Sequence, residues 1–162
     1  MSKVPISIVM GSQSDLSTVK ETLNILKEFK AGFEVRVLSA HRTPKELVKY
    51  VETASQGGVK VFIAAAGGAA ALAGVVAAHT PLPVIGIPME TKSLKGLDSL
   101  LSTVQMPAGI PVACVAVGSA GAKNAAYLAL QILGVADKKL QGKILALRKS
   151  QAQKIQQIKL KV

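Results

Sequence analysis

The sequence of 162 residues is poor in aromatic residues and has almost no cysteine: there are no Trp, two Tyr, three Phe and one Cys. A single cysteine excludes an internal disulfide, and no Cys/His spacing typical of a metal site occurs. Cys114 stands in the apolar run PVACVAV, where a buried structural thiol is the simpler interpretation. With so few rings, the core must be built from Val, Ile, Leu and Ala, as in sheets covered by helices on both faces.

Long apolar segments are also missing. The longest run, residues 64–78, is mostly Ala and Gly, and it falls short of the roughly 18 strongly apolar residues that a membrane-spanning helix needs. The N-terminus has one Lys and a short apolar run that leads into a Gly-Ser turn instead of a signal cleavage site. The chain has the length of one domain, and we expect a cytoplasmic protein that does not enter a membrane.

Acidic residues are few: 20 Lys and Arg face nine Asp and Glu, a net charge of +11. Such a charge raises the possibility of a nucleic-acid-binding module. However, residues 137–162 hold eight basic residues against one Asp, a net +7, whereas residues 1–136 hold twelve against eight acids, a net +4. Because the charge is concentrated in a tail and aromatic rings for base stacking are scarce, we expect no nucleic-acid partner.

Short Val/Ile-rich runs bounded by turn residues alternate with helical patterns. The runs predict five buried strands, at residues 4–10, 33–39, 60–66, 82–88 and 111–117. Helical spacing is seen at Leu16, Val19, Leu23 and Leu26 and again at Leu47, Val48 and Val51, and residues 121–133 form a strong helix pattern closed by Gly134. This alternation predicts right-handed βαβ units and a three-layer α/β/α sandwich with about five parallel strands.

The tail, residues 137–162, predicts one more helix, a basic amphipathic extension of the single α/β domain that we place at residues 1–136. Its apolar stripe comprises Leu140, Ile144, Leu147, Ile155, Ile158 and Val162. Two interpretations are open: the stripe is buried on a neighbouring subunit, or the helix is a solvated basic element of its own domain.

In open parallel sheets, ligands bind beyond the carboxyl ends of the strands. The loop after the first predicted strand is GSQSD, residues 11–15. Its Ser and Asp residues are either a helix cap or a phosphate and ribose site, since free N–H groups attract an anion and a carboxylate accepts from sugar hydroxyls. The loop is not a P-loop. It also lacks the acidic pair of a phosphorelay acceptor, and the chain has few rings to stack on a flavin.

The loop after the second predicted strand is LSAHRTP. Thr43, Pro44 and Glu46 fit a capping box, with Thr at the N-cap, Pro at the first helical position and Glu three residues after Thr. This local explanation leaves His41 and Arg42 without a structural reason. A histidine can hold or release a proton near neutral pH, and an arginine can bind a phosphate through two hydrogen bonds. Alone, the pair is more simply explained as a surface pair without a function.

The loop after the third predicted strand, residues 64–74, contains two glycines that allow close approach of a ligand, although tight helix packing explains them as well. The QMPAGIP segment precedes the last strand and should therefore lie at the opposite edge of the sheet, where it could serve only a neighbouring subunit's site. His79 stands at a helix end, and we interpret it as structural.

The order of these loops is more specific than each alone. GSQSD, SAHRTP, AGGAAALAG and GLDSLLSTVQMPAGIPVACVAVG together closely resemble the N5-carboxyaminoimidazole ribonucleotide mutase family of purine synthesis, over about residues 4–135. The resemblance implies a flavodoxin-like subunit in a homo-octamer with active sites between subunits and no cofactor or metal. It also implies a reaction in which the carboxylate on the exocyclic nitrogen leaves as CO2 and is then attached to ring carbon C4 of the aminoimidazole ribonucleotide.

Carried over by motif, the resemblance makes His41 the catalytic acid and base. It assigns the phosphate to Ser39 and Arg42, phosphate and ribose to Ser12 and Asp15, and the wall of the CO2 pocket to Gly67, Gly68 and the backbone that follows. The complete expected binding set is Gly11, Ser12, Ser14, Asp15, Ser39, Arg42, Gly67, Gly68, Ala69, Ala71 and Leu72.

One position departs from the pattern. The family usually reads AGGAAHLPG where this chain has AGGAAALAG, so Ala71 replaces a second histidine and Ala73 a proline. Three explanations are open: a mutase competent through His41, an aminoimidazole ribonucleotide carboxylase that uses CO2 directly, or an ordinary mutase impaired by a histidine-to-alanine change.

Overall fold

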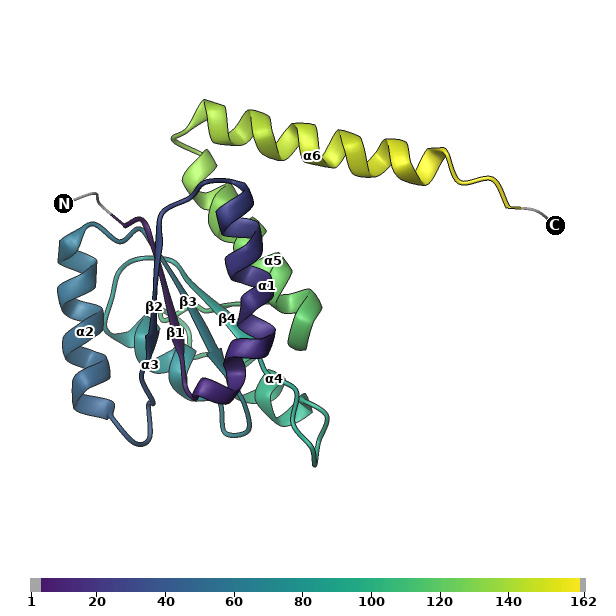
Figure 1. Ribbon diagram of the computed structural model, residues 1–162. Coiled ribbons are helices and arrows are strands. Elements are labelled where there is room, and N and C mark those ends of the chain that lie inside the picture. The colour runs from purple at the N-terminus through teal and green to yellow at the C-terminus, as the bar shows by residue number, and fades with distance from the viewer. Residues whose placement is uncertain (1–3, 161–162) are drawn as a thin grey trace.

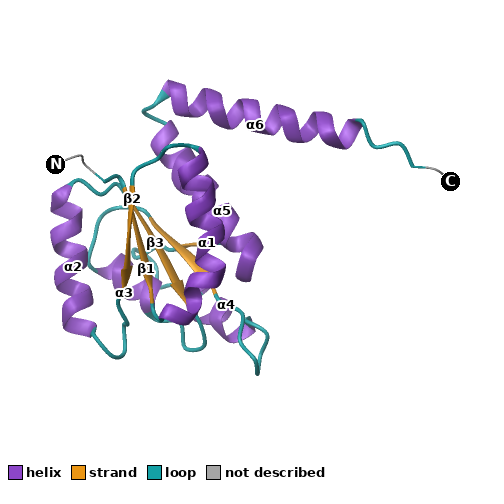
Figure 2. Ribbon diagram, in the orientation of Figure 1, coloured by secondary structure: helices purple, strands orange, loops and turns teal. Residues whose placement is uncertain are grey.

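The computed structural model describes residues 4–160 as a five-stranded parallel sheet between two layers of helices (Figures 1 and 2). The strands are β1 (Ile6–Met10), β2 (Phe33–Val37), β3 (Val61–Ala66), β4 (Val84–Pro88) and β5 (Ala113–Cys114). Their order is β2-β1-β3-β4-β5, and all neighbouring pairs are parallel. This order is the flavodoxin-like one, so the predicted α/β/α sandwich is confirmed.

The helices are η1 (Gln13–Asp15), α1 (Leu16–Glu28), α2 (Pro44–Gly57), α3 (Leu72–Ala78), α4 (Leu97–Val104), α5 (Gly118–Gly134) and α6 (Lys138–Gln156). Helices α1 and α5 cover one face of the sheet, and α2 and α3 cover the other (Figure 1). Successive side chains of β1 point to opposite faces of the sheet. Ile6 and Ile8 are buried under α1 and α5, whereas Val9 is buried under α2 and α3.

The fifth strand is shorter than predicted. A strand over residues 111–117 was expected, but only Ala113 and Cys114 pair with β4. Two features shorten the ladder: Pro111 has no N–H to donate, and the N–H of Cys114 turns back to the carbonyl of Val112 at 3.0 Å. Cys114 is half-buried, and burial raises the pKa of its thiol.

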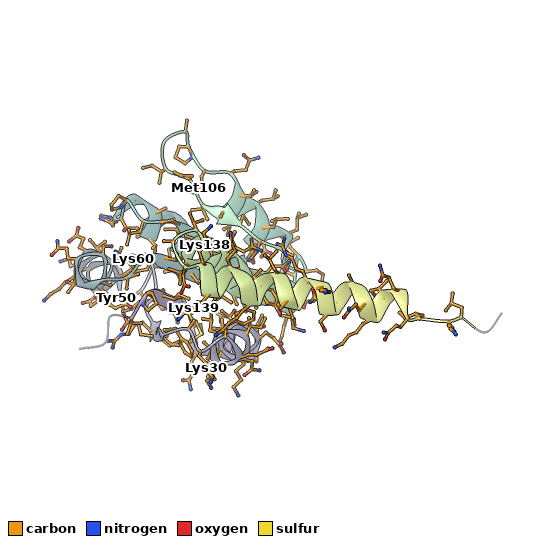
Figure 3. The ribbon with its side chains drawn as sticks, turned by 90° about the horizontal axis from the view of Figure 1, so that it is seen from above. Lys30, Tyr50, Lys60, Met106, Lys138 and Lys139 are labelled. Atoms are coloured by element: carbon orange, nitrogen blue, oxygen red, sulfur yellow. The ribbon has the colours of Figure 1, made fainter. Side chains whose placement is uncertain are left out.

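Helix α6 begins at a well-formed cap, since Oδ1 of Asp137 accepts from the N–H groups of Lys139 and Leu140 at 2.9 and 3.1 Å. Its first half packs on its own domain, where Ile144 is buried with Leu140 and Leu147 beside it. Its second half extends away from the domain (Figures 1 and 3).

The predicted stripe is therefore divided. Ile155 is 70% exposed, Ile158 lies beyond the end of the helix at Gln156 and is not part of a helical stripe, and Val162 lies outside the described residues. Within residues 4–160, no helix is both long and apolar enough to cross a membrane.

Candidate functional site

The carboxyl ends of β1 to β4 meet at one edge of the sheet, and their hydrogen-bond ladder continues past the strands. The N–H of Leu38 donates to Met10 O at 2.9 Å, that of Gly11 to Ala65 O at 3.0 Å, and that of Met89 to Ala66 O at 2.9 Å. These bonds fix the starts of the loops after β1, β2 and β4 against their neighbouring strands.

A cavity of about 430 Å³ lies between the first three loops. Its lining comprises Gly11, Ser12, Ser14, Asp15, Ser39, Ala40, His41, Arg42, Ala66, Gly67, Ala69, Ala71 and Leu72. Three segments far apart in the sequence thus bring together every expected site residue except Gly68. The sequence prediction missed Ala40 and Ala66, whose methyl groups carry no chemical signal; only their position beside the motif residues could have pointed to them.

The first loop is both a helix cap and part of the cavity. Ser12 stands at the N-cap of η1, and its hydroxyl oxygen accepts from the N–H of Ser14 at 3.3 Å. Asp15 makes no capping bond to α1. Burial raises the pKa of the Asp15 carboxyl, because desolvation outweighs the hydrogen bonds from Ser12 and Ser14 and the charge of Arg42.

In the second loop, the predicted capping box is wrong in its hydrogen bonds. Thr43 does stand at the N-cap of α2 and Pro44 does begin the helix, but the Thr43 side chain makes no bond to the helix. Its Oγ1 instead accepts from the N–H of Ser39 at 2.8 Å and lies 3.2 Å from the Ser39 carbonyl. Through these two contacts with Ser39, Thr43 closes the loop that carries His41 and Arg42.

Arg42 ties the second loop to the first. Its Nη2 donates to the carbonyl of Gly11 at 2.7 Å, and its Nε lies 3.4 Å from Oγ of Ser39. A guanidinium has five N–H donors, so these bonds orient the group and leave further donors for an anion.

The third loop forms a wall of small residues. A Cβ added to Gly67 would lie 3.3 Å from Cβ of Met89, which shows how closely the loop approaches the end of β4. Ala71 stands at the N-cap of α3 and, like Ala69, lines the cavity with a methyl group. This wall leaves space and supplies no acid or base.

The arrangement can therefore bind a phosphorylated sugar. A guanidinium and several hydroxyls suit the phosphate, a carboxylate suits sugar hydroxyls, and His41 is the one imidazole in the lining. Among residues 4–160, no group of three or more His, Cys, Asp or Glu side chains is placed to hold a metal ion.

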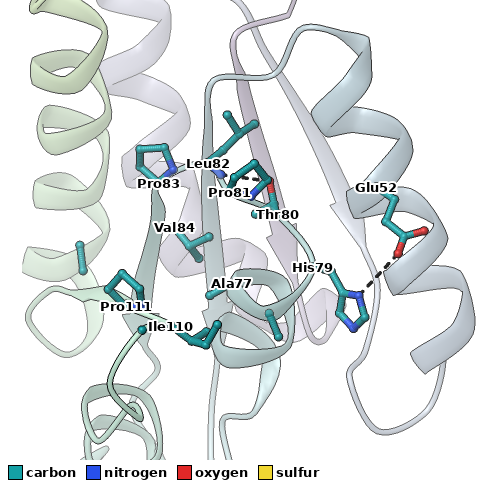
Figure 4. A pocket seen from close by; sticks show the side chains of 13 residues that line it. Glu52, Ala77, His79, Thr80, Pro81, Leu82, Pro83, Val84, Ile110 and Pro111 are labelled. Atoms are coloured by element: carbon teal, nitrogen blue, oxygen red, sulfur yellow. Dashed lines mark hydrogen bonds and ion pairs between the residues drawn. The ribbon is translucent and has the colours of Figure 1, made fainter.

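A larger hollow of about 840 Å³ lies at the opposite edge of the sheet, between the end of α3 and the segment before β5 (Figure 4). Gly109, Ile110 and Pro111 line it, so the expected position of QMPAGIP is confirmed. His79, at the C-cap of α3, has Nδ1 3.6 Å from Oε1 of Glu52. The rest of the lining is largely Pro, Ala, Val and Leu, and it lacks the converging polar groups of the smaller cavity.

Fold and site together define a class: a flavodoxin-like α/β protein with a small polar pocket at the carboxyl edge of its sheet. A family model described as AIR carboxylase matches residues 5–154. The chain therefore belongs to the AIR carboxylase family, and the resemblance read from its loops is confirmed.

Relatives named N5-carboxyaminoimidazole ribonucleotide mutase include that of Vibrio parahaemolyticus, 49% identical over 93% of each chain. The one from Saccharolobus solfataricus is 54% identical over 86% of this chain and 87% of its own. Among solved structures, Treponema denticola PurE superposes with a TM-score of 0.84 at 32% identity, covering 93% of this chain and 92% of its own.

Proposed function

We propose that the protein acts in purine biosynthesis by interconverting N5-carboxyaminoimidazole ribonucleotide and 4-carboxy-5-aminoimidazole ribonucleotide. One observation carries the proposal: three separate loops assemble the expected residues into a single cavity. It is supported by relatives of about half-identical sequence that are named as mutases of this substrate.

The phosphate is bound by Arg42 and the hydroxyl of Ser39, which already lie within 3.4 Å of each other. Ser12 contributes a further hydroxyl. Asp15 accepts hydrogen bonds from the ribose hydroxyls. Its carboxylate is half-buried and has lost part of its hydration, so any donor that replaces the missing water stabilises its charged form. The imidazole base of the substrate then lies toward His41 and the small-residue wall.

His41 performs both proton transfers. The bond between the exocyclic nitrogen and the carboxyl carbon breaks, its electron pair stays on nitrogen, and His41 donates a proton to that nitrogen as CO2 forms. Carbon C4 then attacks CO2, and the neutral imidazole of His41 removes the proton that C4 carried. The proton given in the first step is regained in the second, so the reaction is a balanced isomerisation and consumes no cofactor.

Ala71 leaves His41 without a second imidazole in the cavity lining. We propose that the chemistry proceeds through His41 alone, with activity reduced by the missing donor. The alternative is a carboxylase that joins aminoimidazole ribonucleotide to CO2 directly, a reaction consistent with the description of the family.

A comparison of two substrates tests the proposal. The mutase converts N5-carboxyaminoimidazole ribonucleotide to the C4-carboxylated isomer faster than the spontaneous rate. A carboxylase forms that product from aminoimidazole ribonucleotide and CO2 but not from the N-carboxylated compound. A folded sample that binds the nucleotide and converts neither substrate would refute both forms of the proposal.

We also propose that the subunits form a homo-octamer in which α6 packs on a neighbour. Large apolar side chains are exposed on α4 and its preceding loop and on α6, namely Leu94, Leu97, Leu101, Val104, Leu145 and Ile155. Exposed apolar patches of this kind mark contact surfaces.

Truncation before Asp137 should lower the assembly state, measured by light scattering. A full-length chain that runs as a monomer, or a truncated chain of unchanged assembly, would contradict the packing. The cytoplasmic location remains a prediction.

A further inference from the structure

Helix α4 lies outside the cavity lining but contacts the loop behind it. Ser99 on this helix is fully buried, and its Oγ accepts from the N–H of Gly68 at 3.0 Å. Ser102, one turn further on, has Oγ 3.2 Å from the Gly68 carbonyl and 2.7 Å from that of Asp98. Both peptide groups of Gly68 therefore face hydroxyls of α4.

Gly68 needs such support because of its backbone. Its φ is +71°, in the left-handed region that glycine reaches freely but leaves as easily. Gly67, which lines the cavity, is the residue before it, so the peptide between them links the cavity wall to α4. The hydrogen bond that Oγ of Ser99 accepts from the N–H of Gly68 selects one conformation of this peptide.

The helix is itself anchored at its start. Thr91 donates from Oγ1 to Oδ1 of Asp98 at 2.9 Å, and Oγ1 also accepts from the N–H of Gly96 at 3.2 Å. Thr91 follows β4, whose end packs against Gly67. The sheet, α4 and the glycine loop thus form one connected unit.

We propose that Ser99 is a positioning residue for the glycine wall of the cavity, with Ser102 as a weaker second support. This inference rests on the proposed function, in which the wall retains CO2 between its release from nitrogen and its capture by C4. When the Gly68 peptide is free to turn, the wall loosens, and CO2 leaves before C4 attacks. The enzyme then releases aminoimidazole ribonucleotide in place of the C4-carboxylated isomer.

The test is Ser99→Ala, with N5-carboxyaminoimidazole ribonucleotide as substrate. The ratio of aminoimidazole ribonucleotide to C4-carboxylated product, corrected for spontaneous decarboxylation, should rise roughly tenfold, because the half-buried N–H of Gly68 loses its acceptor and the native loop is disfavoured. The Kd of the nucleotide product should change less, since Arg42 and Ser39 remain. Hydrogen exchange measured by mass spectrometry should become faster in peptides that cover residues 66–72.

Two comparisons separate positioning from general stability. Thr103→Val removes a buried bond to the Ser99 carbonyl, 2.7 Å long, on the same helix without touching Gly68, and it should leave the ratio unchanged. Ser102→Ala should raise the ratio slightly and Ser102→Thr should restore it, because Thr keeps the hydroxyl. If Ser99→Ala does not fold, Ser99→Cys keeps one heavy atom beyond Cβ, slightly larger than oxygen and a poorer acceptor, and should shift the ratio in the same direction.

The proposal is overturned if folded Ser99→Ala shows the wild-type ratio and wild-type exchange, or if Thr103→Val shifts the ratio equally. A wild-type protein that converts no substrate refutes the proposed function instead. In that case, faster exchange at residues 66–72 in Ser99→Ala still supports the positioning role, and unchanged exchange overturns it.

Discussion

Thr43→Val removes one hydroxyl from the loop of His41 and Arg42 with little change in volume. In the native loop, Oγ1 of Thr43 bonds to both the N–H and the carbonyl of Ser39, at 2.8 and 3.2 Å. The backbone bond from Thr43 N–H to Ser39 O, 3.0 Å long, remains in the variant. The substitution therefore weakens the closure of the loop without unfolding α2.

A lost neutral hydrogen bond costs about 1 kcal/mol, and a buried group left unpaired costs about 1–3 kcal/mol. Ser39 is only half-buried, so water recovers part of this loss, and we expect the free energy of unfolding to fall by about 1–2 kcal/mol. For a chain of this size, Tm should drop by about 3–6 °C. The kcat/KM should fall roughly tenfold or more, because His41 and Arg42 lose their fixed positions.

Urea denaturation and steady-state kinetics measure the two effects. Thr43→Ser keeps the hydroxyl and should restore most of both. Thr53→Val is the matched control, since it removes a local bond on α2, 2.8 Å from Oγ1 to the Lys49 carbonyl, far along the helix from the loop. If Thr43→Val matches Thr53→Val in both stability and kcat/KM, the hydroxyl does not hold the loop and the reasoning fails.

Two further predictions concern His41 and Tyr50. His41→Asn should lower kcat by roughly 10²-fold or more, since it removes the acid and base. The Kd of the nucleotide, measured by calorimetry, should stay within a few-fold of the wild-type value. Surviving turnover would show that another group moves the protons. Burial raises the pKa of Tyr50 to about 12 from 10.0. Between these two pH values the Tyr50 hydroxyl ionises in the unfolded chain but stays neutral in the folded chain, so the free energy of unfolding falls as pH rises. In chemical denaturation between pH 10 and 12, wild type should lose stability more steeply than Tyr50→Phe, and equal slopes would contradict the assignment.

Much of the fold is predictable from sequence because buried parallel strands are uninterrupted apolar runs. The predicted strands at residues 4–10 and 60–66 contain β1 and β3. The run at 111–117 looked equally good, yet only two of its residues join the sheet. The run does not form a longer strand because Cys114 satisfies its N–H within its own segment, and apolar composition carries no information about that choice.

The candidate site was predictable to a similar degree. Carboxyl ends of parallel strands share one edge of the sheet, so residues that directly follow strands are expected to lie close together. This rule alone predicts the proximity of four lining residues: Ser12, Asp15, His41 and Arg42. The hydrogen bonds were not predictable. Thr43 fits a capping box by spacing, but its hydroxyl bonds to Ser39 instead, in a loop whose start is held by the bond from Leu38 to Met10, a contact between distant segments.

The electrostatics of the cavity favour a nucleotide over a bare phosphate. Asp15 is half-buried with a raised pKa, and the charge of Arg42 lowers that pKa without overcoming desolvation. An anion bound at Arg42 weakens this compensation and makes the Asp15 carboxylate costlier still. Sugar hydroxyls attached to the same phosphate can donate to Asp15 at a distance from the anion and offset the cost, whereas the hydroxyl of inorganic phosphate would bring the anion's own negative charge against the carboxylate. We therefore expect the cavity to bind a ligand that presents an anion and hydroxyl donors together better than it binds a simple anion.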